Sequence, residues 1–205
     1  MIASLEIIFG VAVLIMSVVA HEVSHGYAAA FLGDPTARLA GRLTLNPLRH
    51  IDPIGSIVVP FISYMTGGFI FGWARPVPYN PYNLRDQRWG PAIVAVAGPL
   101  ANLFIALVFG LFLRFGGGVI DASAISIVVL VVYINLLLPI FNLIPIPPLD
   151  GSKILFAALP VKYLYVQQWL ERYALIFVIL FVFVLWKFFL PVVFWLFTLI
   201  TGMAL

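Results

Sequence analysis

Three long apolar runs divide the chain, and each is long enough to form a helix that crosses a membrane. They cover residues 2–32, 89–115 and 122–144, and about 20 apolar residues are sufficient to span the hydrocarbon core of a bilayer. Turn residues separate the runs, and arginines cluster between the first and the second run. The pattern therefore predicts a core of three transmembrane helices.

The C-terminal part of the chain is also apolar, but it is less regular. Residues 173–205 are interrupted by Lys187 and Pro191, so they fit either one long kinked helix or two short helices. We therefore expect a membrane-embedded core in residues 1–160. Residues 161–205 then supply one or two C-terminal transmembrane helices rather than a separate soluble domain.

Between the first and second runs, residues 53–73 are apolar but contain Pro60 and a pair of glycines. Basic residues flank this segment on both sides, which favours an element that dips into the bilayer and returns. Residues 37–45 and 77–83 alternate polar and apolar positions next to turn residues, a pattern typical of small strands. The expected fold is an all-α polytopic membrane protein with a re-entrant or membrane-face β element.

Composition narrows the function classes. The chain of 205 residues is 63% hydrophobic and 9% charged, and its mean hydropathy is +1.13, more than a water-exposed surface tolerates. A soluble globular enzyme is therefore excluded. The net charge of +3 comes from scattered residues, so we expect no nucleic-acid partner. The absence of cysteine excludes a disulfide framework, a thiol nucleophile and a cysteine-bound metal.

The basic residues predict how the helices are oriented. Lysine and arginine accumulate in cytoplasmic loops, and neither occurs in the loop at residues 116–121. We therefore place this loop outside the cell and the other three polar regions in the cytoplasm. The basic residues of those regions are Arg38, Arg42, Arg49, Arg75, Arg85, Arg88, Lys153, Lys162 and Arg172.

A secretory signal peptide is the competing interpretation of the first run. The small residues before His21 resemble a cleavage site, but residues 1–7 contain no basic residue, which a signal peptide requires. Cleavage there would also leave His21 as the new N-terminus. We therefore interpret the first run as a transmembrane helix.

The first predicted helix carries ionisable residues where the bilayer makes them costly. His21, Glu22 and His25 form an H-E-x-x-H string. Residues four apart share one face of a helix, so both imidazoles can bind one metal ion while Glu22 reaches a bound water. Zinc suits imidazole ligands and lowers the pKa of bound water to about 7. The structural alternative is that both histidines hydrogen-bond neighbouring helices, with Glu22 as their counter-ion.

A catalytic zinc usually has three protein ligands, and Asp150 is the best candidate for the third. It follows a proline-rich segment, residues 142–149, that prevents a regular helix on the predicted cytoplasmic side. The aspartates of the other cytoplasmic loops stand beside turn or strand signals, and Glu6 lies too far along the first helix to share the metal. Asp150 could also cap a helix that starts at Gly151 or Ser152.

Four motifs follow one another across most of residues 18–155. They are HEVSH (21–25), PLRHIDPIG (47–55), GPLAN (98–102) and NLIPIPPLDG (142–151). Together they resemble the site-2 protease family of intramembrane zinc metalloproteases. The resemblance is to the short members, because we recognise no PDZ-like insertion and no CBS pair. Residues from 162 onward match no motif of the family.

This resemblance implies one Zn²⁺ per chain, bound by His21, His25 and Asp150, with Glu22 as the general base. It also implies that the chain hydrolyses peptide bonds in transmembrane segments, as in regulated intramembrane proteolysis. The substrates would be membrane proteins or remnant signal peptides. In a prokaryotic cell the lipid bilayer around it would be the plasma membrane, and the active site would face the cytoplasm.

Three further residues are candidates for the site. In the family, an asparagine at the position of Asn102 is thought to lie near the active site, where it could hold substrate. An interhelical hydrogen bond is the alternative. Asn142 belongs to the proline-rich motif and could bind the unwound backbone or an incoming peptide. His50 could approach the zinc, or it could bond to Asp52 or to a turn.

Two other functions fit parts of the pattern. A membrane metal transporter or carrier could use the same His/Asp cluster as a transit site, but it would not need Glu22 as a base. A scaffold without activity would have no use for costly polar groups in lipid. For a protease, the predicted strands at residues 37–45 and 77–83 would offer an edge to which an unwound substrate adds.

Overall fold

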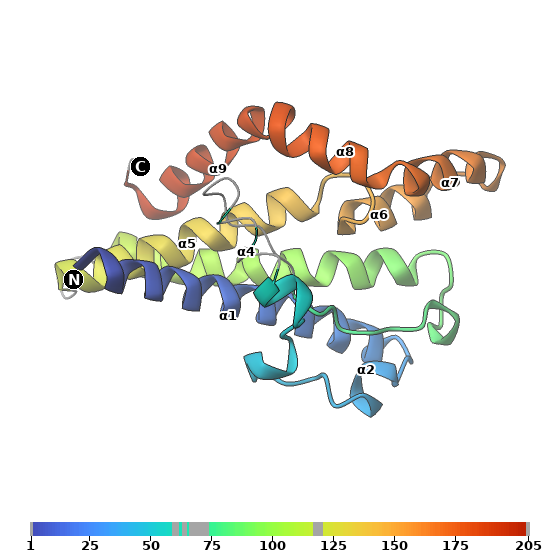
Figure 1. Cartoon of the computed structure of the whole chain (residues 1–205), viewed down its shortest axis with the longest axis horizontal. Coiled ribbons are helices and arrows are strands. Elements are labelled where there is room, and N and C mark those ends of the chain that lie inside the picture. The colour runs from blue at the N-terminus through green and yellow to red at the C-terminus, as the bar shows by residue number, and fades with distance from the viewer. Residues whose placement is uncertain (1, 59–61, 63–64, 66–73, 117–120, 204–205) are drawn as a thin grey trace.

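The computed structural model describes residues 2–58, 62, 65, 74–116 and 121–203 (Figure 1). Within these residues every regular element is helical. Four helices are long and apolar enough to cross a membrane, namely Ile8–Phe31, Gly90–Gly116, Ala124–Asn142 and Ala174–Thr201. The prediction of an all-α polytopic membrane protein is confirmed.

The helices follow the predicted apolar runs. The core spans are α1 (Ile2–Phe31), α4 (Gly90–Gly116) and α5 (Ala122–Asn142). The shorter elements around them are α2 (Thr36–Leu39), 3-10 turns at Pro47–Arg49, Pro81–Asn83 and Val161–Tyr163, a π turn at Ile54–Val58, and α6 (Asp150–Ala158). The C-terminal elements are α7 (Leu164–Arg172), α8 (Ala174–Leu180), a π segment at Phe181–Leu185, and α9 (Trp186–Thr201).

Helix α4 lies at the centre of the bundle, because it packs against α1, α5, α6 and α9. Gly110 permits the close approach of α9. A Cβ atom at this position would lie 2.4 Å from Cγ2 of Ile200, and small residues are how membrane helices come together. The core between α4, α5 and α9 is formed by Ala106, Leu113, Val132, Leu136, Val193 and Phe197.

The C-terminal region is one helical run rather than two separate helices. Residues 174–201 are helical throughout, and the π segment between α8 and α9 accounts for the bend visible in Figure 1. Phe181, in that segment, is buried against Ile144 and Leu149. This helical run, residues 174–201, is called the C-terminal arm; it packs against the proline-rich segment, residues 142–149, that leads to Asp150.

The predicted β element is wrong for the residues that the structure describes. Residues 36–39 form α2, and Gly41 turns the chain with a φ of +63°. Residues 77–80 run without regular structure into a 3-10 turn. Pro76 and Pro78 have no backbone N–H, so this segment cannot donate a ladder of hydrogen bonds. Alternating polarity alone did not reveal this.

The predicted re-entrant segment, residues 53–73, lies largely outside the described residues. Its first part, Ile54–Val58, is a π turn. Whether the remainder dips into the bilayer stays a prediction.

Asp34 organises the loop that leaves α1. Its buried carboxylate accepts hydrogen bonds from the hydroxyl of Thr36 at 2.5 Å, the backbone N–H of Asn80 at 2.7 Å and the amide of Asn83 at 2.9 Å. Burial favours the neutral acid, but these donors outweigh it and lower the pKa of Asp34 below its ordinary value. Asp34 thereby joins the start of this loop to its end, before α4.

The first prediction concerns the pH dependence of stability. The carboxylate of Asp34 stabilises the fold above the ordinary aspartate pKa of about 3.9, and this contribution disappears as the pH falls through the lower pKa of the folded state. In the Asp34→Asn variant an NH₂ group, which can only donate, replaces one of the two oxygen atoms that accept hydrogen bonds from these neighbours. We therefore expect a lower Tm than wild type at pH 7, with the difference shrinking below about pH 4.

Thermal unfolding in detergent from pH 7 to pH 3 measures this difference. The exposed Asp121 provides the control variant, Asp121→Asn, which also removes one carboxylate. A Tm difference for Asp34→Asn that stays constant over the whole pH range would contradict the assignment.

Candidate metal centre

Three side chains from distant parts of the chain meet at one point between α1 and α6. The Nε2 atoms of His21 and His25 each lie 3.1 Å from Oδ2 of Asp150. Helix α1 places both imidazoles on one face because they are four residues apart. All three residues are buried. Among the described residues, this is the group whose ligand atoms are close enough to hold a metal ion.

Asp150 reaches this point because the chain after α5 makes a tight return. Gly151 lies directly on the backbone at the end of α5, and a Cβ atom there would be 2.1 Å from the carbonyl oxygen of Leu143. Asp150 is the first residue of α6, and its helix has no side-chain cap. Its carboxylate faces the two imidazoles instead of capping the helix.

Hydrogen bonds on the far side of each ring fix the two histidines. Nδ1–H of His21 donates to Oδ1 of Asn102 at 2.6 Å, and Nδ1–H of His25 donates to the carbonyl oxygen of Val94 at 2.7 Å. Both acceptors lie on α4. With the protons on Nδ1, the Nε2 lone pairs of both rings point at the carboxylate of Asp150. Three converging lone pairs repel one another unless a cation or a proton lies among them.

The donor set and its spacing fit zinc. Neutral imidazole and carboxylate are both zinc ligands, and tetrahedral bonds of about 2.0–2.1 Å keep ligand atoms about 3.3 Å apart. The observed separations of 3.1 Å between Nε2 and Oδ2 are close to that edge. A partner on Nδ1 is also what metal-binding histidines usually have.

Gly98 on α4 makes room for the imidazoles. A Cβ atom at this position would lie 2.5 Å from Nε2 of His25 and 2.7 Å from Nε2 of His21. Any side chain on this residue would therefore occupy the space where the two nitrogen atoms lie. The GPLAN motif supplies both this gap and, four residues later, the acceptor Asn102.

A buried amide network supports Asn102. Its Nδ2 donates to the backbone carbonyl of Ser17 at 3.1 Å and to Oδ1 of Asn135 at 2.7 Å, and Asn135 donates in turn to the hydroxyl of Ser17 at 2.8 Å. The network connects α1, α4 and α5 behind His21. Asn135 matches no motif in the sequence and is structural by that interpretation, and Ser17 was not predicted; both are polar residues inside apolar spans, which is the signal that could have found them.

Glu22 lies beside the metal centre and is half-buried. Its Oε2 accepts a hydrogen bond of 2.8 Å from the backbone N–H of Val77. One carboxylate oxygen is thus held by the loop that precedes α4. Glu22 is not among the three residues whose ligand atoms converge.

The other two candidates, His50 and Asn142, each bond to a nearby backbone carbonyl group. The buried His50 donates from Nε2 to the carbonyl oxygen of Thr44 at 2.9 Å. Asn142, at the end of α5, donates to the carbonyl oxygen of Leu138 at 3.0 Å, one turn earlier in its own helix. Neither of these hydrogen bonds involves His21, His25 or Asp150.

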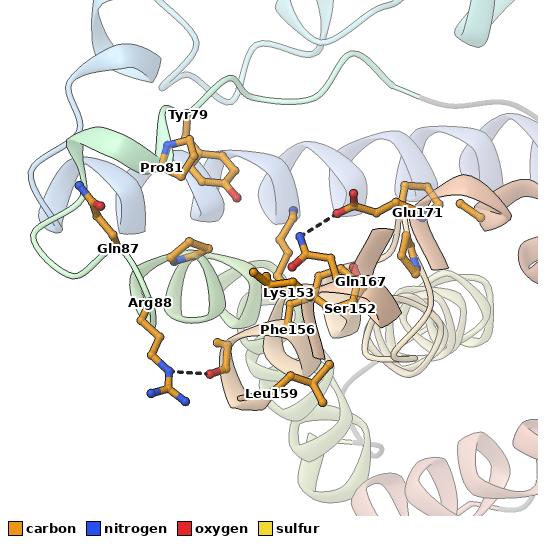
Figure 2. Close-up of a pocket in the computed structure, with 16 residues that line it drawn as sticks. Tyr79, Pro81, Gln87, Arg88, Ser152, Lys153, Phe156, Leu159, Gln167 and Glu171 are labelled. Carbon is orange, nitrogen blue, oxygen red and sulfur yellow. Dashed lines mark hydrogen bonds between the residues drawn. The ribbon is translucent and has the colours of Figure 1, made fainter. Parts of the chain in front are cut away.

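An open cleft of about 770 Å³ borders the centre, between α6, α7 and the loop before α4 (Figure 2). Lys153 links the two, because its Nζ lies 3.2 Å from Oδ1 of Asp150 and 5.6 Å from the centre of the Tyr79 ring. Other residues that line the cleft include Pro81, Gln87, Arg88, Phe156, Gln167 and Glu171.

The second prediction tests the gap at Gly98. The Gly98→Ala variant should bind zinc about 10–100-fold more weakly, because the methyl group displaces both imidazoles from the positions that their Nδ1 partners hold. Alanine favours a helix more than glycine does, so α4 should stay intact. Zinc content by elemental analysis and competition with a chelator measure the loss.

Gly10→Ala is the matched control, because a Cβ atom there would lie 3.6 Å from Leu130, an ordinary contact distance. This variant should keep the wild-type zinc affinity. Wild-type affinity in Gly98→Ala would mean that the site can shift to accept the methyl group.

Comparison with known proteins agrees with this geometry. The model of peptidase family M50 matches residues 116–185. YwhC of Bacillus subtilis strain 168, which bears the name of a zinc metalloprotease, is 38% identical over 84% of this chain and 82% of its own length. Rip2 of Mycolicibacterium smegmatis, named likewise, is 33% identical over 67% of this chain and 52% of its own. No solved structure gives a significant match.

The extent of the match to YwhC shows the family, which agrees with the resemblance found in the motifs. Four apolar spans make the chain an integral protein of a lipid bilayer, and its cofactor is zinc. The chain is a zinc metalloprotease and belongs to peptidase family M50, the site-2 protease family.

Proposed function

We propose that this protease is an intramembrane endopeptidase, which hydrolyses peptide bonds within transmembrane segments of other membrane proteins. The observation that carries the proposal is the convergence of His21, His25 and Asp150 within a bundle of membrane-spanning helices. His25 lies six residues before the end of α1, roughly two turns deep. The reacting bond would therefore lie below the membrane surface.

The residues of the site divide the chemistry among them. His21, His25 and Asp150 would hold the zinc ion, which supplies a Lewis acid that polarises the scissile carbonyl and makes water a better nucleophile. Glu22 is assigned as the general base. Because Val77 N–H holds Oε2, the other oxygen, Oε1, would take a proton from the attacking water and pass it to the leaving amine.

Asn102 is assigned to the orientation of His21 rather than to substrate. Its carbonyl oxygen accepts from His21 and its amide donates to Ser17 and Asn135, so it has little capacity left for a peptide. Asn142 and His50 are assigned to the local backbone, because each bonds to a nearby carbonyl group. None of the three is needed as a group that touches the substrate.

The cleft beside Lys153 is the proposed path of the unwound substrate (Figure 2). A helical peptide hides its carbonyl groups in hydrogen bonds, so it must unwind before hydrolysis. The cleft provides an open, partly polar surface next to Asp150 where an extended segment can lie. Substrate addition to a strand edge is not proposed, because the described residues of 37–45 and 77–83 form no strand.

The orientation follows from the distribution of charge. Arg88 and Lys153 line the cleft, and basic residues concentrate on the cytoplasmic side of membrane proteins. We therefore propose that the site opens toward the cytoplasm. The relatives named above come from bacteria, which supports a prokaryotic plasma membrane as the location.

The third prediction separates the protease from a metal transporter. The Glu22→Gln variant should fold and bind one zinc ion per chain but cleave a model transmembrane substrate about 10²- to 10⁴-fold more slowly, the usual contribution of a general base. A transporter would move metal into vesicles with either residue. Cleavage assays in liposomes, with zinc analysis of the same samples, distinguish the two functions.

Asp121→Asn serves as the control for removing a carboxylate, since Asp121 is exposed at the opposite end of α5. Mass spectrometry of the products locates the cleaved bond. Cleavage confined to soluble peptides, or full activity of Glu22→Gln, would refute the proposal.

A further inference from the structure

The buried Arg42 has no part in the chemistry assigned so far. Its side chain is only 8% exposed, although arginine is seldom buried without a specific partner. The guanidinium donates to three backbone carbonyl groups, those of Arg49, Arg75 at 2.9 Å and Pro76 at 3.3 Å. One side chain therefore joins segments of the chain that are more than 30 residues apart.

The segment that Arg42 holds also contacts Glu22, the proposed general base. Arg42 holds the carbonyl groups of Arg75 and Pro76, and the next backbone N–H, that of Val77, donates to Oε2 of Glu22. The N–H of Arg75 adds a hydrogen bond of 2.9 Å to the carbonyl oxygen of His50. The segment that reaches Glu22 is thus fixed on both sides of its backbone.

Close packing against α1 also fixes the position of residues 75–77. Gly26 lies one turn after Glu22, and a Cβ atom there would be 2.6 Å from Leu43 and 2.7 Å from Val77. Leu43 is the neighbour of Arg42 in sequence. The missing side chain at Gly26 lets both segments lie against the helix close to Glu22.

We infer that Arg42 is a positioning residue for Glu22, acting through the backbone of residues 75–77. This inference rests on the proposed function, because it takes Glu22 as the general base. A guanidinium is suited to this role since its planar fork can bind several carbonyl groups at once, whereas the ammonium group of lysine is a compact point charge. A shift of about 1 Å in a catalytic group can cost about 10²-fold in rate.

The fourth prediction uses two variants that disturb the segment in different ways. Arg42→Lys keeps the charge but loses the fork, and Gly26→Ala pushes Val77 away from α1. Each should keep one zinc per chain and a KM within about threefold of wild type, with kcat lowered about 10–100-fold. Hydrogen exchange in a peptide covering residues 74–80 should become faster, because the Val77 amide loses its fixed acceptor.

Arg38→Lys is the control, since Arg38 is an exposed arginine on the adjacent α2. It should match wild type in every measurement. Zinc-loaded Arg42→Lys with wild-type kcat and wild-type exchange would overturn the inference. So would a loss of activity that only follows a loss of zinc in both variants, because Arg42 would then maintain the site as a whole.

If Arg42→Lys does not yield folded protein, Gly26→Ala provides the same comparison without touching the guanidinium. If the wild-type protein cleaves no transmembrane substrate, the proposed function fails, while the exchange measurement still decides whether Arg42 holds the Val77 amide.

Discussion

The structure depends on one electrostatic constraint, the meeting of three lone pairs in an apolar bundle. Two imidazole nitrogens each lie 3.1 Å from one carboxylate oxygen, an arrangement that is unfavourable unless a cation or a proton lies among them. Because all three residues are buried in the bundle, bulk water does little to relieve this repulsion. The fold therefore brings the three ligands together and supplies partners for the rest of each side chain, chiefly from α4.

Three glycines support the site because each lacks a side chain where neighbouring groups need the room. Gly98 leaves room for the imidazoles, Gly151 allows the return after α5, and Gly26 lets the loop lie against α1. In each case an added Cβ atom would come closer than 3 Å to a neighbouring atom. Rigid helices can hold a precise site in a membrane only if their backbones approach closely at such points.

The sequence was sufficient to predict the spans and to select His21, His25 and Asp150, which the structure brings together. Apolar runs of about 20 residues are a strong signal for a membrane span, and ionisable residues inside them are costly enough to be noticed. The strand predicted at residues 77–83 is wrong because Pro76 and Pro78 have no backbone N–H to donate to a neighbouring strand. The alternation of polar and apolar residues does not take these missing donors into account. Arg42 looked like an ordinary cytoplasmic arginine, since its partners are backbone carbonyl groups of Arg75 and Pro76, which no side-chain pattern encodes.

The distance in sequence between the ligands gives the centre a second consequence. His21 and Asp150 are 129 residues apart, and the chain has no cysteine with which to form a covalent cross-link. A metal ion bound by both would close a loop of more than half the chain. It would thus serve the fold as a disulfide serves a secreted domain, by restricting the unfolded ensemble. The same three ligands would then join α1 to the start of α6, next to the proline-rich segment that packs against the C-terminal arm.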